Sequence, residues 1–181
     1  MTEDHQHVTV WKGRYLSMLK CGHWEYATRL TGKPGVGIVA ITDAGKLVLV
    51  EQYRIPIGRR VVELPAGLTG DIPGAENEQL LEGAQRELLE ETGYSANAWT
   101  KLTTGYSSPG LTDESVVLFL AEGLEKIGPG GGDSSESIQV HEVALDRVLP
   151  WLAERGQNAD LKLLAGLYSL QQYQLTGGKT E

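Results

Sequence analysis

Three glutamates lie close together at the end of one predicted helix, and they limit the roles that this helix can have. Residues 77–93 read NEQLLEGAQRELLEETG. Apolar side chains recur every four residues from Leu80 to Leu88, a spacing typical of an amphipathic helix. Asn77 is the expected N-cap. Gly93 is expected to follow the last helical residue, because glycine adopts the left-handed conformation that ends many helices.

On such a helix Glu87, Glu90 and Glu91 project from one face. Like charges at this spacing repel, and carboxylates near the C-terminus of a helix meet the negative end of its dipole. One interpretation is a solvated acidic face. The other is a site for Mg²⁺, which proteins commonly hold with one or two carboxylates. Arg86 is expected to pair with Glu78, two helical turns earlier.

Residues 67–94 resemble the signature of the Nudix hydrolases, G x5 E x7 R E U x E E x G U, where U is aliphatic. Glu78 and the run from Arg86 to Gly93 match it in order. The chain departs from the signature in two ways, since ten residues instead of five precede Glu78 and the final aliphatic position is Tyr94. The additional residues are rich in glycine and proline, so they predict a longer loop before the helix.

Composition and charge are those of a small globular protein. The chain has 181 residues, of which 40% are hydrophobic and 22% charged, so one compact core is expected. A net charge of −8 argues against a nonspecific nucleic-acid binder, which needs a basic surface. The single cysteine, Cys21, excludes an intramolecular disulfide and fits a reducing compartment. The first residues contain no basic region followed by an apolar run, and we predict a cytoplasmic protein with no membrane partner.

The predicted elements indicate an α+β fold. Turn residues and alternating apolar positions predict strands, and leucine periodicity predicts a second helix near the end. Expected strands cover residues 8–19, 23–31, two segments of 35–54, 61–67, 99–104, 114–121 and 138–144, and the helix covers 159–175. The resemblance implies a Nudix α/β/α sandwich in residues 33–181. Residues 1–32 would add an N-terminal antiparallel strand region that serves dimerisation.

The resemblance extends to one branch of the family. The segments EQYRIPIGRRVVELPAG, SSPGLTDE and ESIQVHEV are similar to those of ADP-ribose pyrophosphatases and nucleoside-diphosphate-sugar hydrolases. Taken alone, Arg54 reads as a strand-end arginine in a surface salt bridge; the resemblance makes it a substrate ligand. In full, the resemblance implies metal ligands Ala66 (through its backbone carbonyl), Glu87 and Glu91, substrate-binding residues Arg54, Glu63 and Glu114, and catalytic residues Arg86, Glu90 and Glu136.

A diphosphate resists attack by water because its oxygens are already anionic, so a metal ion and a general base are both expected. Glu136, in the glycine-rich stretch GGGDSSESIQV, is the expected base, and Glu90 is the competing one. The predicted reaction is Mg²⁺-dependent (alternatively Mn²⁺-dependent) hydrolysis of a nucleoside diphosphate sugar, such as ADP-ribose or GDP-mannose, by a homodimer. The alternatives are a Nudix hydrolase of nucleoside triphosphates or dinucleoside polyphosphates, and a non-catalytic sensor of nucleotide sugars.

Overall fold

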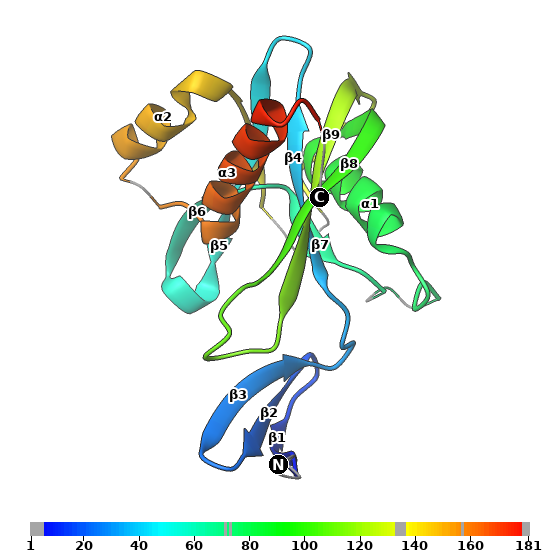
Figure 1. Ribbon diagram of the computed structural model, residues 1–181, viewed down its shortest axis with the longest axis vertical. Helices are drawn as coiled ribbons and strands as arrows, with labels where there is room; N and C mark the ends of the chain where they lie inside the picture. The colour runs from blue at the N-terminus through cyan, green and yellow to red at the C-terminus, as the bar shows by residue number, and fades with distance from the viewer. Residues whose placement is uncertain (1–5, 71, 73, 133–136, 157, 179–181) are drawn as a thin grey trace.

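The protein consists of a small antiparallel sheet at the N-terminus and a larger mixed sheet flanked by helices (Figure 1). The computed structural model describes residues 6–70, 72, 74–132, 137–156 and 158–178. The small sheet projects from one end of the body, and the larger sheet with its helices forms the rest. The predicted α+β class is confirmed.

The N-terminal sheet has three strands, β1 (Val8–Lys12), β2 (Leu16–Cys21) and β3 (Trp24–Arg29), in the order β1-β2-β3. The prediction of one continuous strand over residues 8–19 was wrong. The chain turns between β1 and β2, where the Gly13 amide donates a hydrogen bond to the Leu16 carbonyl at 2.8 Å. A second turn at Gly22, whose φ is 60°, joins β2 to β3.

The larger sheet has seven strands. Five follow the order β10-β5-β4-β9-β8, while β6 pairs with β5 and β7 with β4. Among the strand pairs in the described residues of this sheet, β4 and β9 run parallel and the others antiparallel. The bounds are β4 (Gly35–Ile41), β5 (Lys46–Arg54), β6 (Arg59–Glu63), β7 (Ala66–Leu68), β8 (Tyr94–Tyr106), β9 (Ser115–Lys126) and β10 (Gln139–Ala144).

The segment VVELPAG, predicted as one strand, contributes to two. It is interrupted at Pro65, which has no amide hydrogen to continue a strand ladder, and β7 begins at the next residue to pair with β4. Strand β8 is longer than the predicted 99–104, because it starts directly after the end of the first helix.

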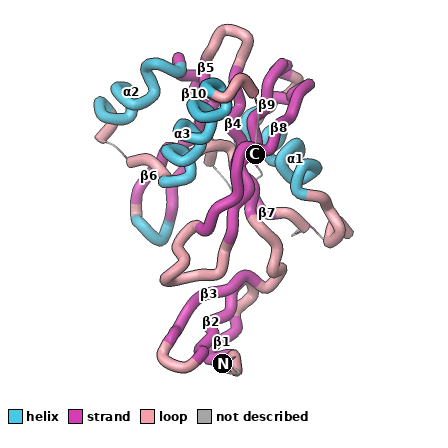
Figure 2. Tube along the Cα trace, in the orientation of Figure 1, coloured by secondary structure: helices cyan, strands magenta, loops and turns pink. Residues whose placement is uncertain are grey.

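Helices cover both faces of the larger sheet, as Figure 2 shows, so the predicted α/β/α sandwich is confirmed. On one face α1 (Leu80–Thr92) buries Ala84 and Leu88 against β4 and β9. On the other face, α3 (Leu161–Leu175) and α2 (Val148–Glu154) bury a second core. Two short 3-10 helices, Ile55–Ile57 and Leu145–Arg147, complete the helical elements of the described residues. The sequence did not predict α2. No helix in the described part of the chain is long and apolar enough to cross a membrane.

The first helix starts later than predicted. Its N-cap is Gln79 instead of Asn77, and the Gln79 amide donates to Glu82 Oε2 at 2.9 Å, three residues into the helix. Its end is as predicted, since Gly93 has φ 73° and its amide donates to the Leu89 carbonyl at 2.8 Å. The loop predicted before this helix is present, although Asp71 and Pro73 lie outside the described residues.

Candidate active site

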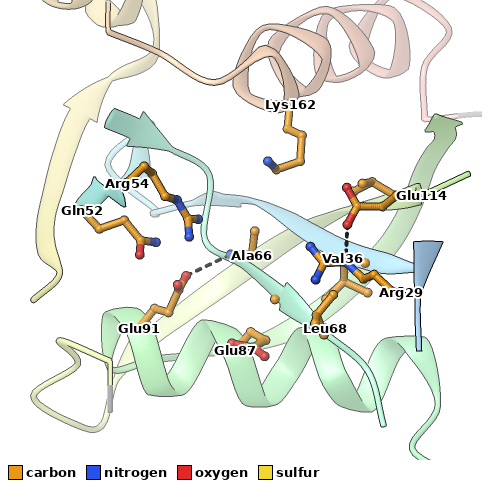
Figure 3. Close-up of a pocket in the computed structure, with 13 residues that line it drawn as sticks. Arg29, Val36, Gln52, Arg54, Ala66, Leu68, Glu87, Glu91, Glu114 and Lys162 are labelled. Atoms are coloured by element: carbon orange, nitrogen blue, oxygen red, sulfur yellow. Dashed lines mark hydrogen bonds and ion pairs between the residues drawn. The ribbon is translucent and has the colours of Figure 1, made fainter. Parts of the chain in front are cut away.

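The acidic end of α1 lies against strand β7 at the floor of a cleft of about 350 Å³ (Figure 3). Glu87 and Glu91 both line this cleft. Glu91 is only 3% exposed, and its Oε2 accepts a hydrogen bond from the Ala66 amide at 2.9 Å. Gly67, the next residue of β7, has no side chain, which leaves room for the Glu87 carboxylate. The structure therefore brings the three predicted metal ligands together.

Arg86 organises the carboxylates around it. Its guanidinium binds both carboxylate oxygens of Glu78, at 2.9 and 3.1 Å, as the spacing predicted. It also donates to Glu87 Oε1 at 2.8 Å, to Glu90 Oε2 at 3.1 Å and to the Leu68 carbonyl at 2.9 Å. The hydrogen bonds from Arg86 hold the pKa of Glu78 below its usual value. The repulsion expected among the helix carboxylates is thus offset within the protein.

Cations form the opposite wall of the cleft. Arg54 donates two hydrogen bonds, at 2.6 and 2.8 Å, to Glu63, which is 2% exposed and holds the guanidinium in place. Lys162, in the first turn of α3, points into the cleft from above in Figure 3 and pairs with Asp160. Arg54 is therefore more than a surface salt-bridge residue, because it lines the cleft.

The N-terminal sheet also reaches this cleft. Arg29, the last residue of β3, lines it and donates to Glu114 Oε1 at 2.5 Å. Burial would raise the pKa of Glu114, but hydrogen bonds from Arg29 and Ser107, together with the charges of Arg29 and Lys162, outweigh it and keep this pKa below the usual value. Of the predicted substrate-binding residues, Glu63 and Glu114 therefore both contact an arginine of the site.

Sequence reasoning missed three residues with polar or charged side chains in the cleft, Arg29, Gln52 and Lys162. Gln52 lies two residues before Arg54 on β5, so the alternation of side chains along a strand would have placed both on one face. No comparable sequence pattern predicts that Arg29 and Lys162 line the cleft. They come from the N-terminal sheet and the last helix, and only the tertiary fold brings them to the cleft.

The two candidate bases, Glu90 and Glu136, differ in what the structure shows of them. Glu90 bonds Arg86, its side chain is 51% exposed, and it is absent from the described lining of the cleft. Glu136 lies outside the described residues. The glycines before it are anchored to the end of α1, since the amides of Gly131 and Gly132 donate to the carbonyls of Glu91 and Glu90 at 2.8 and 3.0 Å. Gly131 and Gly132 therefore lie at the acidic end of α1.

The cleft floor fits a hard divalent cation. Its donors are carboxylate oxygens beside a strand backbone, and hard cations prefer oxygen ligands. In the described part of the chain no three acidic, histidine or cysteine side chains gather closely enough to hold a metal by themselves. Two carboxylates, Glu87 and Glu91, agree with the one or two that Mg²⁺ usually takes from a protein when substrate phosphates and water complete its shell.

A mixed sheet between helical layers, with a carboxylate-bearing helix below a cationic cleft, is the arrangement expected of a Nudix protein. The sequence matches the family model described as NUDIX domain over residues 31–167, and the chain belongs to this family. The resemblance seen in residues 67–94 is confirmed.

Two relatives and one solved structure define the similarity further. The chain is 42% identical over 140 residues to an ADP-ribose pyrophosphatase of Bacillus subtilis (strain 168), a match that covers 76% of this chain and 72% of that protein. It is 39% identical over 124 residues to a methanol dehydrogenase activator of Bacillus methanolicus, covering 67% of this chain and 64% of the relative.

A crystal structure titled ADP compounds hydrolase superposes with a TM-score of 0.74, covering 97% of this chain and 95% of that one. At 23% sequence identity this likeness supports the fold alone. The two relatives carry different names, so membership of the family does not by itself define the substrate.

Proposed function

We propose that this protein hydrolyses the diphosphate linkage of a nucleoside diphosphate sugar, such as ADP-ribose or GDP-mannose, to a nucleoside monophosphate and a sugar phosphate. One observation carries the proposal: the cleft has a carboxylate floor, from Glu87 and Glu91, directly opposite a cationic wall that includes Arg54 and Lys162. A diphosphate fits this arrangement. The cationic side chains would contact it from one side, and a metal ion held by the carboxylates would contact it from the other. The similarity to the Bacillus subtilis ADP-ribose pyrophosphatase supports the choice of substrate class.

The floor residues would hold the metal. Glu87 and Glu91 supply carboxylate oxygens, and the backbone carbonyl of Ala66 is the third proposed ligand. When bound there, a divalent cation, Mg²⁺ or alternatively Mn²⁺, neutralises phosphate charge and lowers the pKa of bound water. The N–H of Ala66 fixes one oxygen of Glu91, which leaves the orientation of that carboxylate set before the cation arrives.

The wall residues would bind the substrate. Arg54 and Arg29 present guanidinium groups that suit bidentate phosphate recognition, and Lys162 adds a point charge. We assign Glu63 and Glu114 to substrate binding through these arginines, whose orientation they fix. Arg86 acts on catalysis as a positioning residue, because it bonds Glu87 directly.

A general base must take a proton from the attacking water. We propose Glu136, which follows Gly132 by four residues in the sequence; the Gly132 amide donates to the Glu90 carbonyl at the acidic end of α1. Glu90 is the alternative. Its contact with Arg86 favours a role in fixing the carboxylate network over proton transfer.

We further propose a homodimer formed through residues 1–32, in the cytoplasm, where Cys21 would remain reduced. The N-terminal sheet supports this assembly because it exposes large apolar side chains, namely Val8, Val10, Trp11, Tyr15 and Trp24. Light scattering at micromolar concentration tests it. A mass of 19.7 kDa, that of one chain, together with full activity would exclude the dimer.

Turnover of a substrate panel tests the function. Purified protein with Mg²⁺ is given ADP-ribose, GDP-mannose, ATP and a dinucleoside tetraphosphate, and products are identified by chromatography and mass. We expect AMP and ribose 5-phosphate, or GMP and mannose 1-phosphate, as the products formed fastest. Faster turnover of ATP or the dinucleoside substrate would instead support the alternative Nudix activity. Tight binding of nucleotide sugars without turnover would support the sensor.

A further inference from the structure

A second charged cavity lies apart from the active site. It has a volume of about 420 Å³, within the roughly 300–1,000 Å³ range of small-ligand sites. It is bounded by the start of β6, the end of α2 and the segment that follows α2, and it shares no lining residue with the catalytic cleft. The lining consists of Glu51, Arg59, Arg60, Val62, Leu152, Glu154, Arg155 and Asn158.

Arginines dominate the charge of this cavity. Three guanidinium groups line it, against the carboxylates of Glu51 and Glu154. Glu154 is mostly exposed and pairs with Arg147 at 3.5 Å. Positive charge therefore exceeds negative charge locally, in a chain whose net charge is −8. Such a concentration of like-charged arginines is costly unless an anion offsets it.

Glu51 does not supply that anion alone, because it is already shared. Its buried Oε2 accepts hydrogen bonds from Arg155 at 2.5 Å and from His141 Nε2 at 2.8 Å, and Arg60 Nε lies 3.4 Å from its Oε1. Burial would raise the pKa of Glu51, but the bonds from His141 and Arg155 bring this pKa below its usual value. Glu51 thus stays ionised and fixes Arg155.

The guanidinium groups are held in place yet accessible. Arg155 stacks over the Trp151 ring, 4.8 Å from its centroid, and its side chain remains 40% exposed. Arg60 donates to the Glu51 carbonyl at 2.7 Å. Arg59 meets Asn158 Oδ1 only at 3.5 Å, the long limit of a hydrogen bond. Arg59 is thus the member of the set with the weakest contact to the protein.

Backbone hydrogen bonds join two walls of the cavity. The Val62 amide donates to the Asn158 carbonyl at 2.8 Å, and the Asp160 amide donates to the Val62 carbonyl at 3.0 Å, so the segment after α2 is bonded to β6. A preformed set of arginines suits a planar or tetrahedral oxyanion, which it can bind through paired N–H donors. Because Glu154 pairs with Arg147 outside the cavity, three guanidinium groups face the one remaining carboxylate, Glu51. A phosphate group, with about two negative charges at neutral pH, offsets this excess better than a carboxylate does.

We propose that the cavity formed by Arg59, Arg60 and Arg155 is a second anion site, which binds inorganic phosphate or the phosphate group of a small phosphomonoester. Glu51 and Gln52 are consecutive residues of β5 whose side chains point to opposite faces, one to this cavity and one to the catalytic cleft. Arg60 also donates to the Ser137 carbonyl at 3.3 Å, which ties the cavity to the chain that enters β10.

The test follows arginine side-chain N–H signals of the ¹⁵N-labelled full-length protein by NMR, in metal-free buffer of constant ionic strength, as inorganic phosphate is added. We expect the Arg59 and Arg155 signals to shift saturably. Arg59→Gln should weaken phosphate binding, read at Arg155, by about tenfold, the effect of losing one charge-assisted hydrogen bond. Arg54→Gln, in the catalytic cleft, and Arg14→Gln, a charge-matched change in the turn between β1 and β2, should leave it unchanged.

Shifts that do not saturate, an affinity unaffected by Arg59→Gln, or a loss that follows Arg54→Gln would each overturn the proposal. Parallel titrations with AMP and ribose 5-phosphate identify the source of the phosphate. Tighter saturation of the Arg59 signal by either compound supports a phosphomonoester ligand, and tighter saturation by inorganic phosphate supports the free anion.

Discussion

Gly67 and Glu87 are in such close contact that no other residue fits at position 67 without displacing the carboxylate. A Cβ atom built on Gly67 would lie 2.0 Å from Glu87 Oε1 and 2.5 Å from Oε2. The signature glycine of β7 thus has a physical role, which is to let the carboxylate of α1 reach the strand. The position of a proposed metal ligand is set by the absence of a side chain.

Gly67→Ala should therefore impair catalysis more than folding. The added methyl group drives the end of a flexible glutamate away, so we expect a destabilisation of about 1 kcal/mol, the low end for overpacking. Turnover should fall by about 10²-fold or more, as for loss of one electrostatic contact in an active site. Gly105→Ala in β8 is the control, because a Cβ there meets nothing within 4 Å. Equal turnover in the two variants would contradict this role of Gly67.

Arg86→Lys should destabilise the protein although it preserves charge. A lysine cannot reproduce the forked contacts to Glu78, Glu87 and Glu90 at once. We expect a loss of about 3 kcal/mol in the free energy of unfolding, as when a largely buried ion pair is broken. Denaturant unfolding measures it against Arg59→Lys, which should change stability by less than about 0.5 kcal/mol. A similar loss in both variants would show that the network is not the cause.

The departure of the signature at Tyr94 predicts a tyrosine that ionises late. The Tyr94 hydroxyl donates to Glu142 Oε1 at 2.6 Å, and this bond, with burial and the charge of Glu142, raises the pKa of Tyr94 to about 12. Because the pKa of Tyr94 is higher in the folded than in the unfolded state, this tyrosine stabilises the folded state fully at pH values below about 10, the ordinary pKa of tyrosine. That contribution disappears as the pH rises towards about 12.

Ultraviolet absorbance titration of the wild type and Tyr94→Phe checks this. The variant should lack the tyrosine that titrates above about pH 11. It should also be less stable than the wild type at neutral pH, by an amount that shrinks as the pH rises above 10. If the titration step missing from the variant lies near pH 10, the bond to Glu142 does not control this hydroxyl.

Much of the fold follows from local pattern. The four-residue spacing from Leu80 to Leu88 predicts α1 because the same residues must face the sheet, and Gly93 predicts its end because the backbone there is left-handed. By contrast, α2 escaped prediction. It has only seven residues with Pro150 among them, too few turns for a periodic pattern to emerge.

The residues of the site also fall into two groups, those that local sequence predicts and those that only the tertiary fold brings together. Glu78, Arg86, Glu87 and Glu91 lie on or beside one helix, so their spacing in the sequence already fixes their spacing in space. Arg29 and Lys162 belong to elements at opposite ends of the chain, and their meeting depends on the whole fold. Local sequence therefore predicts the acidic floor of the cleft, and, apart from Arg54, only the structure reveals the cationic wall.

The choice of base can be decided by kinetics. Glu136→Gln should reduce kcat by roughly 10²- to 10⁴-fold, the usual contribution of a general base, with little change in KM or in the Mg²⁺ requirement. Glu90→Gln should alter the Mg²⁺ requirement as well, because Glu90 shares Arg86 with Glu87. A loss of less than about tenfold in Glu136→Gln, with a collapse in Glu90→Gln at saturating Mg²⁺, would place the base on the helix.

The most direct test of the account is the Mg²⁺ dependence of ADP-ribose hydrolysis in the wild type, Glu87→Gln and Glu91→Gln. We expect wild-type turnover to vanish with chelator and return with Mg²⁺. Both variants should lose about 10²-fold or more in kcat and need more Mg²⁺ for half-maximal rate, while Glu122→Gln, an exposed change on β9, behaves as the wild type. Wild-type turnover that persists in chelator, or near wild-type kinetics in either helix variant, would contradict the account.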